Sequence, residues 1–125
     1  MILGLTLRTV HVTWAWVIVA SNTIVGGWAL AAHRWTRVRS PWLWRATAFA
    51  EVAIFVQVVM GVVLIQGMDT KPLQFHMFYG FVAAFTVAIV YSYRAQLKPW
   101  LYLLYGFGGL FLAGLALRAI VVGPH

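Results

Sequence analysis

The chain has 125 residues, of which 63% are hydrophobic and 9% are charged, and its mean hydropathy is +0.88. These values exclude an ordinary soluble domain. Nine Lys and Arg residues outnumber two acids, but the basic residues are dispersed rather than gathered on one face, so we expect no nucleic-acid partner. The absence of cysteine excludes disulfides, thiolate metal sites, iron–sulfur clusters and haem attached through a Cys-x-x-Cys-His motif.

Four apolar runs are each long enough to cross a lipid bilayer, which takes about 20 residues. We expect the spans at about residues 5–32, 46–66, 75–93 and 100–122. The first connector is rich in Arg and Trp, which is typical of a membrane-interface anchor. After the second span, Gly67 and Pro72 break the helix. The sequence therefore predicts an all-α membrane protein with one domain over residues 1–125, a four-helix bundle of up-down-up-down topology.

Basic residues gather on one side of this predicted bundle. Four Lys or Arg residues lie between spans one and two and two between spans three and four, whereas the opposite side has Lys71, with Arg8 and Arg118 near the termini. Loops that stay in the cytoplasm carry an excess of Lys and Arg. We therefore expect both termini on the outer side of a multi-pass protein of the cell membrane, with the prokaryotic plasma membrane as its setting.

Two histidines, His11 and His76, lie near the N-terminal ends of the first and third spans. These spans run in the same direction in the predicted bundle, so the two side chains lie at matched depth in the outer half of the bilayer. Two imidazoles, one on each side of the iron, are the axial ligands of a six-coordinate haem. The spacing predicts His11 and His76 as a haem-binding, metal-ligating pair.

The helical period predicts which residues share a face with each histidine. These residues are Ala15, Ile18, Asn22 and Gly26 beside His11, and Gly80, Ala83 and Val87 beside His76. The small residues next to each histidine leave room for a flat macrocycle. Arg8 and Arg118 are the candidate partners of the haem propionates, because guanidinium binds carboxylate bidentately.

Other polar residues have simpler interpretations. Asn22 and Gln57 are expected to form hydrogen bonds between helices. Glu51 lies inside the second span, where an acid requires a partner or a protonated state, and we expect a contact with the basic connector. His33 and His125 have no evident partner and are not expected to be ligands. Histidines near helix ends can also lie at the membrane interface without a ligand, and that interpretation of His11 and His76 stays open.

Several short motifs follow one another along nearly the whole chain. They are Arg8-x-x-His11, Gln57-x-x-x-Gly61, His76 at the start of the third span, Gly109-x-x-x-x-Gly114-x-x-x-Arg118 and Gly123-Pro124. In this order the chain resembles one half of the heme A synthase family, whose members consist of two four-helix halves, each with a histidine pair at a haem site near the outer surface. The resemblance implies that His11 and His76 are axial ligands, that Gln57 and Gly61 are a packing position, and that Arg118 pairs with a propionate.

The departures from this family narrow the function that the resemblance implies. Arg8 stands where the catalytic half has an acid, and the extracellular cysteine pair of the family is missing. The chain is therefore more similar to the half that only holds haem b, and we do not expect it to be an enzyme. The two-half construction of the relatives implies a homodimer or a place in a larger membrane complex.

Two classes of function stay open. In the first, the protein is a cytochrome b-like membrane protein with haem b, serving electron transfer or as an accessory haem subunit of a respiratory or other complex. In the second, it is a haem-free accessory subunit whose apolar and aromatic surface stabilises a larger assembly or binds lipid. A small transporter ranks lower, because the four spans contain one acid and no pair of Gly- or Pro-broken helices.

Overall fold

The structure of the protein, a computed structural model, describes residues 2–66 and 74–123, with side chains from residue 6 onward. Within these ranges all regular structure is helical. The elements are α1 (Ile2–Arg34), the 3-10 turn η1 (Thr36–Val38), α2 (Pro41–Gln66), α3 (Gln74–Ser92), the 3-10 turn η2 (Lys98–Trp100) and α4 (Leu101–Val121). Four helices are long and apolar enough to cross a membrane. The predicted all-α membrane fold is thus confirmed, while the predicted turn at Gly67–Pro72 lies outside the described residues.

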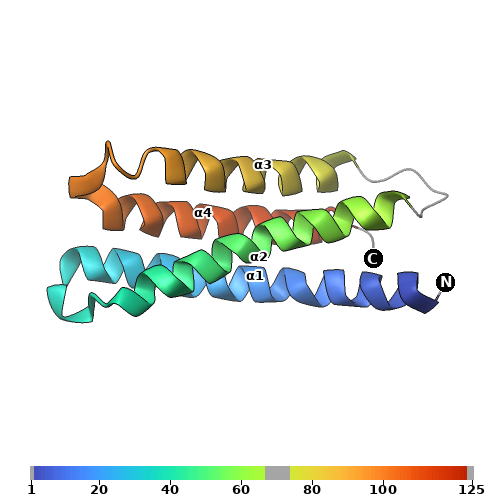
Figure 1. Ribbon diagram of the computed structural model, residues 1–125, viewed down its shortest axis with the longest axis horizontal. Helices are drawn as coiled ribbons and strands as arrows, with labels where there is room; N and C mark the ends of the chain where they lie inside the picture. Colours follow the sequence, from blue (N-terminus) through green and yellow to red (C-terminus); the bar gives the residue numbers. More distant parts are fainter. Residues whose placement is uncertain (1, 67–73, 124–125) are drawn as a thin grey trace.

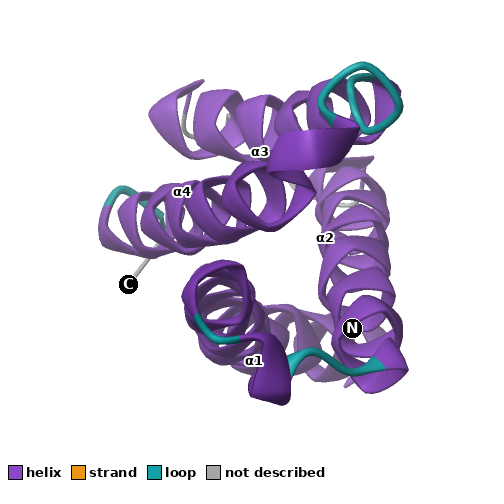
Figure 2. Ribbon diagram, turned by 90° about the vertical axis from the view of Figure 1, so that its left-hand side faces the viewer, coloured by secondary structure: helices purple, strands orange, loops and turns teal. Residues whose placement is uncertain are grey.

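The helices lie lengthwise beside one another (Figure 1). In the end-on view of the bundle, α1 contacts both α2 and α4 (Figure 2). Helix α4 also packs against α3 on its other side. Contact between α2 and α3 is smaller than contact between the other neighbours. The pair α1 and α4, from opposite ends of the sequence, thus forms the most closely packed part of the bundle.

Helix α2 begins at Pro41, before the predicted start of the span at residue 46. Proline is favoured in the first turn of a helix, where its missing N–H removes no intrahelical hydrogen bond. Ser40 accepts a hydrogen bond from the Trp42 N–H at 3.2 Å, as an N-capping residue does. Several of the aromatic and basic residues assigned to the connector are therefore the first turns of α2.

Glycines bring α1 and α4 together. A Cβ atom added to Gly26 would lie 2.9 Å from the Leu110 backbone nitrogen, and one added to Gly109 would lie 3.0 Å from the Gly26 Cα. A Cβ added to Gly106 would lie 2.5 Å from a Leu30 side-chain carbon. Small residues that allow such close backbone approach are typical of helix contacts in membranes. Gly26, Gly106 and Gly109 form what we call the glycine seam.

The core has two apolar clusters along the bundle, with Asn22 between them on α1. The cluster nearer the start of α1 consists of Ile18, Ala53, Ile54, Ala83, Val87 and Leu112. The cluster nearer the first connector consists of Val25, Ala29, Ala32, Leu43, Ala50, Val90 and Tyr105. Asn22 is 1% exposed, and its Nδ2 donates to the carbonyls of Ile18 at 3.0 Å and Ala50 at 3.4 Å. Its predicted role as an interhelical hydrogen-bonding residue is confirmed.

Arginine and tryptophan side chains fix the first connector to the helices. Trp28 Nε1 donates to the Val38 carbonyl at 2.8 Å, and Arg39 Nε donates to the Ala32 carbonyl at 2.8 Å. The Arg39 guanidinium also lies 4.6 Å from the centre of the Tyr102 ring. Cation–π contacts of this kind stabilise exposed pairs by roughly 0.5–1 kcal/mol. This end of the molecule is therefore basic, aromatic and well ordered by its own contacts.

Candidate histidine site

All four helices contribute to one site at the end of the bundle opposite the first connector. His11 comes from the early part of α1, Gly61 from the late part of α2, His76 from the first turn of α3 and Ala119 from the last turn of α4. The glycine seam and the Asn22 hydrogen bonds lie further along the bundle. The apolar cluster around Ile18 and Leu112 separates this site from them.

The structure brings His11 and His76 into contact. Their ring centres are 6.1 Å apart, and the ring planes make an angle of 76°. Both side chains are partly buried. The faces predicted from the helical period are also observed, because Ile18, Asn22 and Gly26 on α1 and Ala83 and Val87 on α3 are buried. The two histidines thus lie at the same level along the bundle.

The imidazole of His76 is held by the end of α4. His76 Nδ1 lies 2.8 Å from the Ala119 carbonyl oxygen. A carbonyl oxygen only accepts, so the ring proton is on Nδ1, and in the neutral ring Nε2 keeps a free lone pair. Metal-binding histidines are usually oriented by such a hydrogen bond from the nitrogen that does not bind the metal. His76 therefore has the form of a ligand that would bind through Nε2.

Gly123 makes room for this hydrogen bond. A Cβ atom on Gly123 would lie 2.9 Å from His76 Nδ1 and 3.0 Å from the Ala119 carbonyl oxygen. Any larger residue would therefore displace the imidazole or the backbone beside it. In the sequence, Gly123 was only part of a motif. The contribution of Ala119 could not be predicted, because it comes from the backbone and not from a side chain.

His11 is contacted by α2. A Cβ atom on Gly61 would lie 3.4 Å from His11 Cε1 and 3.9 Å from His11 Nε2, which are ordinary contact distances. Gln57 Nε2 donates to the His11 backbone carbonyl at 2.7 Å, so its predicted interhelical hydrogen bond is confirmed. His11 Nδ1 and Gln57 Oε1 are buried, and neither has a hydrogen-bond partner among the described residues.

Arg8 and Arg118 belong to the same end of the molecule, and both side chains are exposed. Arg8 precedes His11 by one helical turn, and Arg118 precedes Ala119 in the last turn of α4. Neither forms an ion pair with any residue in 6–66 or 74–123. Both guanidinium groups are thus placed where an anionic group at this end of the bundle could reach them.

The two imidazoles fit the protein ligand set of a six-coordinate haem, because the macrocycle supplies the other four nitrogens. Two imidazoles that share a metal at about 2 Å from each nitrogen have ring centres on the order of 6 Å apart. No group of three or more His, Cys, Asp or Glu side chains that could hold a metal ion by itself occurs in the described part of the chain.

Space beside the histidines comes from glycine. Gly80 lies one turn after His76, and a Cβ atom there would meet nothing within 4 Å. Gly80 was predicted as one of the residues that leave room for a macrocycle. The open space at Gly80 agrees with that prediction. By contrast, Gly109 is used for close packing in the glycine seam.

His33 and Glu51 lie away from the histidine site. His33 is exposed at the basic end, and His125 lies outside the described residues. Glu51 is partly buried on α2, and the expected contact with the basic connector is not found among residues 6–66 and 74–123. Its position in the half of the bundle near the first connector separates it from His11 and His76.

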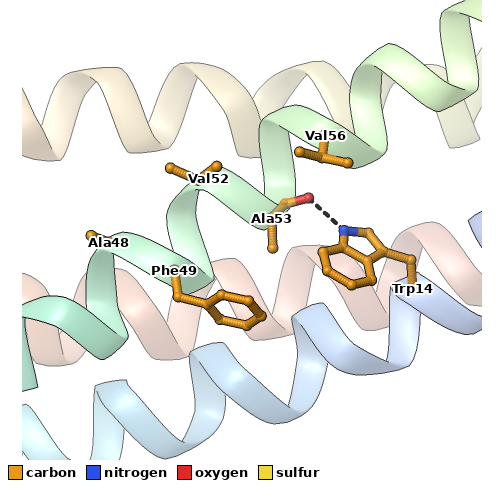
Figure 3. Close-up of a pocket in the computed structure, with 6 residues that line it drawn as sticks. All are labelled: Trp14, Ala48, Phe49, Val52, Ala53 and Val56. Carbon is orange, nitrogen blue, oxygen red and sulfur yellow. Dashed lines mark hydrogen bonds between the residues drawn. The ribbon is translucent and has the colours of Figure 1, made fainter.

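A separate apolar groove lies along α2, where Trp14 of α1 crosses it (Figure 3). The Trp14 Nε1 donates to the Ala53 carbonyl at 2.9 Å, and the indole meets Phe49 edge to face with ring centres 6.2 Å apart. The groove is lined by Trp14, Ala48, Phe49, Val52, Ala53 and Val56. No titratable side chain lines it, so its chemistry suits an apolar chain rather than a reaction.

In comparisons with known proteins, no family model, no curated protein and no solved structure matches this chain.

Proposed function

We propose that this protein is a cytochrome b-like membrane protein that binds haem b between His11 and His76. In this proposal the chain is an up-down-up-down bundle in the cell membrane, in the prokaryotic plasma membrane, with both termini on the outer side. It serves electron transfer, or it is an accessory haem subunit of a respiratory or other membrane complex. The observation that carries the proposal is the 6.1 Å separation of the two imidazoles, contributed by two different helices.

The hydrogen bond of His76 supports the assignment of ligands. Because the Ala119 carbonyl accepts a hydrogen bond from Nδ1–H, the Nε2 lone pair of His76 is free to bind a metal. Gly123 lets the His76 imidazole approach the end of α4, and Gly80 leaves open space one turn from His76. Haem iron, when bound, supplies the one-electron chemistry. The chain's own contribution is to fix the ligands and to exclude water around them.

The exposed guanidinium groups of Arg8 and Arg118 are assigned to the haem propionates. Arginine binds carboxylates bidentately, and these two residues come from the helix ends that surround the histidine site. Their positive charge would stabilise the reduced, less positive form of the iron and raise its potential. An acid in place of Arg8 would act in the opposite direction.

The distribution of charge supports the orientation. The basic residues Arg34, Arg37, Arg39, Arg45, Arg94 and Lys98 all belong to the end of the bundle that contains the first connector. The positive-inside rule assigns that end to the cytoplasm and therefore assigns the histidine site to the outer half of the bilayer.

We also retain the relation to the haem-holding half of the heme A synthase family as part of the proposal. Arg8 in place of an acid argues against oxidation of a haem methyl group. A single half of such a protein would complete its assembly as a homodimer or within a larger membrane complex.

The test is a dithionite-reduced minus air-oxidised visible spectrum of the protein purified in mild detergent. We expect sharp b-type bands in the parent and their loss in His76→Ala, with His33→Ala unchanged as the matched control. A flat spectrum of the parent, expressed with sufficient haem, would refute the proposal.

The apolar groove beside Trp14 favours a second candidate, a haem-free accessory subunit that stabilises a larger complex. Its lining is apolar and aromatic and contains neither histidine, and it would accept an acyl chain or a neighbouring helix. This candidate predicts that Trp14→Ala disrupts co-purification with partner subunits and that the parent has no chromophore. Assembly unaffected by Trp14→Ala would contradict it.

A further inference from the structure

The contact between Gln57 and His11 leaves two complementary atoms unsatisfied. Gln57 Nε2 donates to the His11 carbonyl at 2.7 Å. This bond identifies the other amide atom as the oxygen, because a backbone carbonyl accepts only from the NH₂ group. Gln57 Oε1 is buried without a partner, and His11 Nδ1 is buried without a partner as well. One is an acceptor, and the other becomes a donor when it carries the ring proton.

We infer that Gln57 is a positioning residue for His11, with Oε1 accepting a hydrogen bond from His11 Nδ1–H while Nε2 holds the His11 carbonyl. This hydrogen bond would satisfy both buried atoms, whose isolation is otherwise unfavourable. The oxygen and the nitrogen of the Gln57 amide then both form hydrogen bonds with His11. The proton is fixed on Nδ1, and Nε2 keeps its lone pair.

This arrangement gives His11 the same tautomer that His76 already has. For His76 the acceptor is the carbonyl of Ala119, which lies in the last turn of α4. The carbonyls of a last turn have no intrahelical partner, so one of them is available to an imidazole. On α2, Gln57 already contacts His11 through Nε2, and its Oε1 is a buried acceptor without a partner among the described residues. The Gln57 side-chain carbonyl is therefore the acceptor that α2 offers to His11.

The consequence is a matched pair of ligands. Two imidazoles protonated on Nδ1 each present Nε2 as an acceptor, and their ring centres are 6.1 Å apart. Neither ring can donate to the other from Nε2 in this form. An electron-pair acceptor such as a metal ion between them satisfies both. As a feature of haem binding this inference rests on the proposed function, but the hydrogen bond itself does not.

The tautomer of His11 can be measured without haem, by ¹⁵N NMR of histidine-labelled protein in detergent. We expect Nδ1–H with an unprotonated Nε2 at both His11 and His76 in the parent. In Gln57→Leu the His11 signals should change to a mixture of tautomers while those of His76 stay the same. Gln57→Glu, whose neutral carboxyl group keeps one acceptor and one donor, should restore the parent signals. Asn22→Leu, which removes another buried amide from the same interface, should leave His11 unchanged.

The second readout is haem retention against a haem-binding competitor. We expect retention to fall about 10- to 100-fold in Gln57→Leu, as is typical when the group that orients a ligand is lost, and to recover in Gln57→Glu. An Nε2–H tautomer of His11 in the parent, or an unchanged tautomer and unchanged retention in Gln57→Leu, would overturn the inference. A parent without haem bands but with a Gln57-dependent tautomer would instead refute the proposed function and leave the hydrogen bond established.

Discussion

The two ends of the bundle are constructed differently. Toward the first connector, buried polar groups are paired: Asn22 bonds to two carbonyls, Thr47 donates to the Leu43 carbonyl at 2.8 Å, and Trp28 donates to Val38. At the histidine end, His11 Nδ1 and Gln57 Oε1 are buried without partners among the described residues, and open space lies beside Gly80.

From this difference we infer that the end toward the first connector stabilises the fold and that the histidine end serves function. Satisfied polar groups and close backbone contacts stabilise helix association in membranes. Unsatisfied buried polar atoms are unfavourable, and they are found where a ligand or a change in side-chain position can satisfy them. We therefore expect changes in the glycine seam to unfold the protein and changes around His11 and His76 to alter haem binding in a folded protein.

The largest effect on the fold is expected from Gly26→Ala. Its Cβ atom would lie 2.9 Å from the Leu110 backbone nitrogen and 3.0 Å from the Gly106 carbonyl oxygen, so two backbones have to separate. Overpacking of this kind destabilises by about 1–3 kcal/mol. Thermal melting in detergent should detect it. The control is Gly27→Ala, at the adjacent residue, where a Cβ atom meets nothing within 4 Å. Equal melting temperatures of the two variants would show that the seam is not a close contact.

Gly123→Ala should spare the fold and impair the histidine site. The new methyl group would lie 2.9 Å from His76 Nδ1 and would disturb the hydrogen bond to Ala119. Loss of a group that orients a ligand typically costs about 10- to 100-fold in metal affinity, and we expect a similar loss in haem retention. Gly114→Ala, within α4, is the matched control, because nothing lies within 4 Å of its Cβ position. Normal haem content in Gly123→Ala would argue against His76 as a ligand.

Asn22→Val should moderately lower the stability of the part of the bundle toward the first connector, where the buried polar groups are paired. It removes the hydrogen bonds to Ile18 and Ala50, of which the second joins α1 to α2. Hydrogen bonds between membrane helices contribute about 0.6 kcal/mol on average. We expect a small decrease in denaturation midpoint and unchanged haem spectra. A change in the haem bands comparable to that of His76→Ala would mean that Asn22 also affects haem binding, and that the two ends of the bundle do not have separate roles.

The smallest effect is expected from Arg8→Gln and Arg118→Gln. Both side chains are exposed, so the fold should not change. Removal of a positive charge near the propionates should lower the haem midpoint potential, because the oxidised iron is then less disfavoured. A redox titration measures this, with Arg45→Gln at the basic end as the control. A potential that shifts equally in the control would exclude a local role for Arg8 and Arg118.

Much of this architecture could be predicted from sequence. Apolar length and composition predicted the four helices, and the period of 3.6 residues predicted that Ile18, Asn22 and Gly26 share one face with His11. The start of α2 at Pro41 was missed, because aromatic and basic residues were assigned to the connector although proline and Ser40 favour a helix start there.

The details of the histidine site depend on contacts that no local pattern contains. The Ala119 carbonyl acts through the backbone, and Gly123 matters only because α4 ends beside α3. The hydrogen bond of Gln57 was predicted as a contact between helices, but its acceptor was not. Which carbonyl it reaches depends on the rotation of α1 against α2.

The most direct test of the account is electron paramagnetic resonance of the air-oxidised protein, parent and single histidine variants side by side. We expect a low-spin, six-coordinate iron in the parent and loss of that signal in both His11→Ala and His76→Ala, with His33→Ala like the parent. A high-spin iron in the parent, or a low-spin signal that survives either substitution, would contradict the central claim that these two imidazoles share one haem.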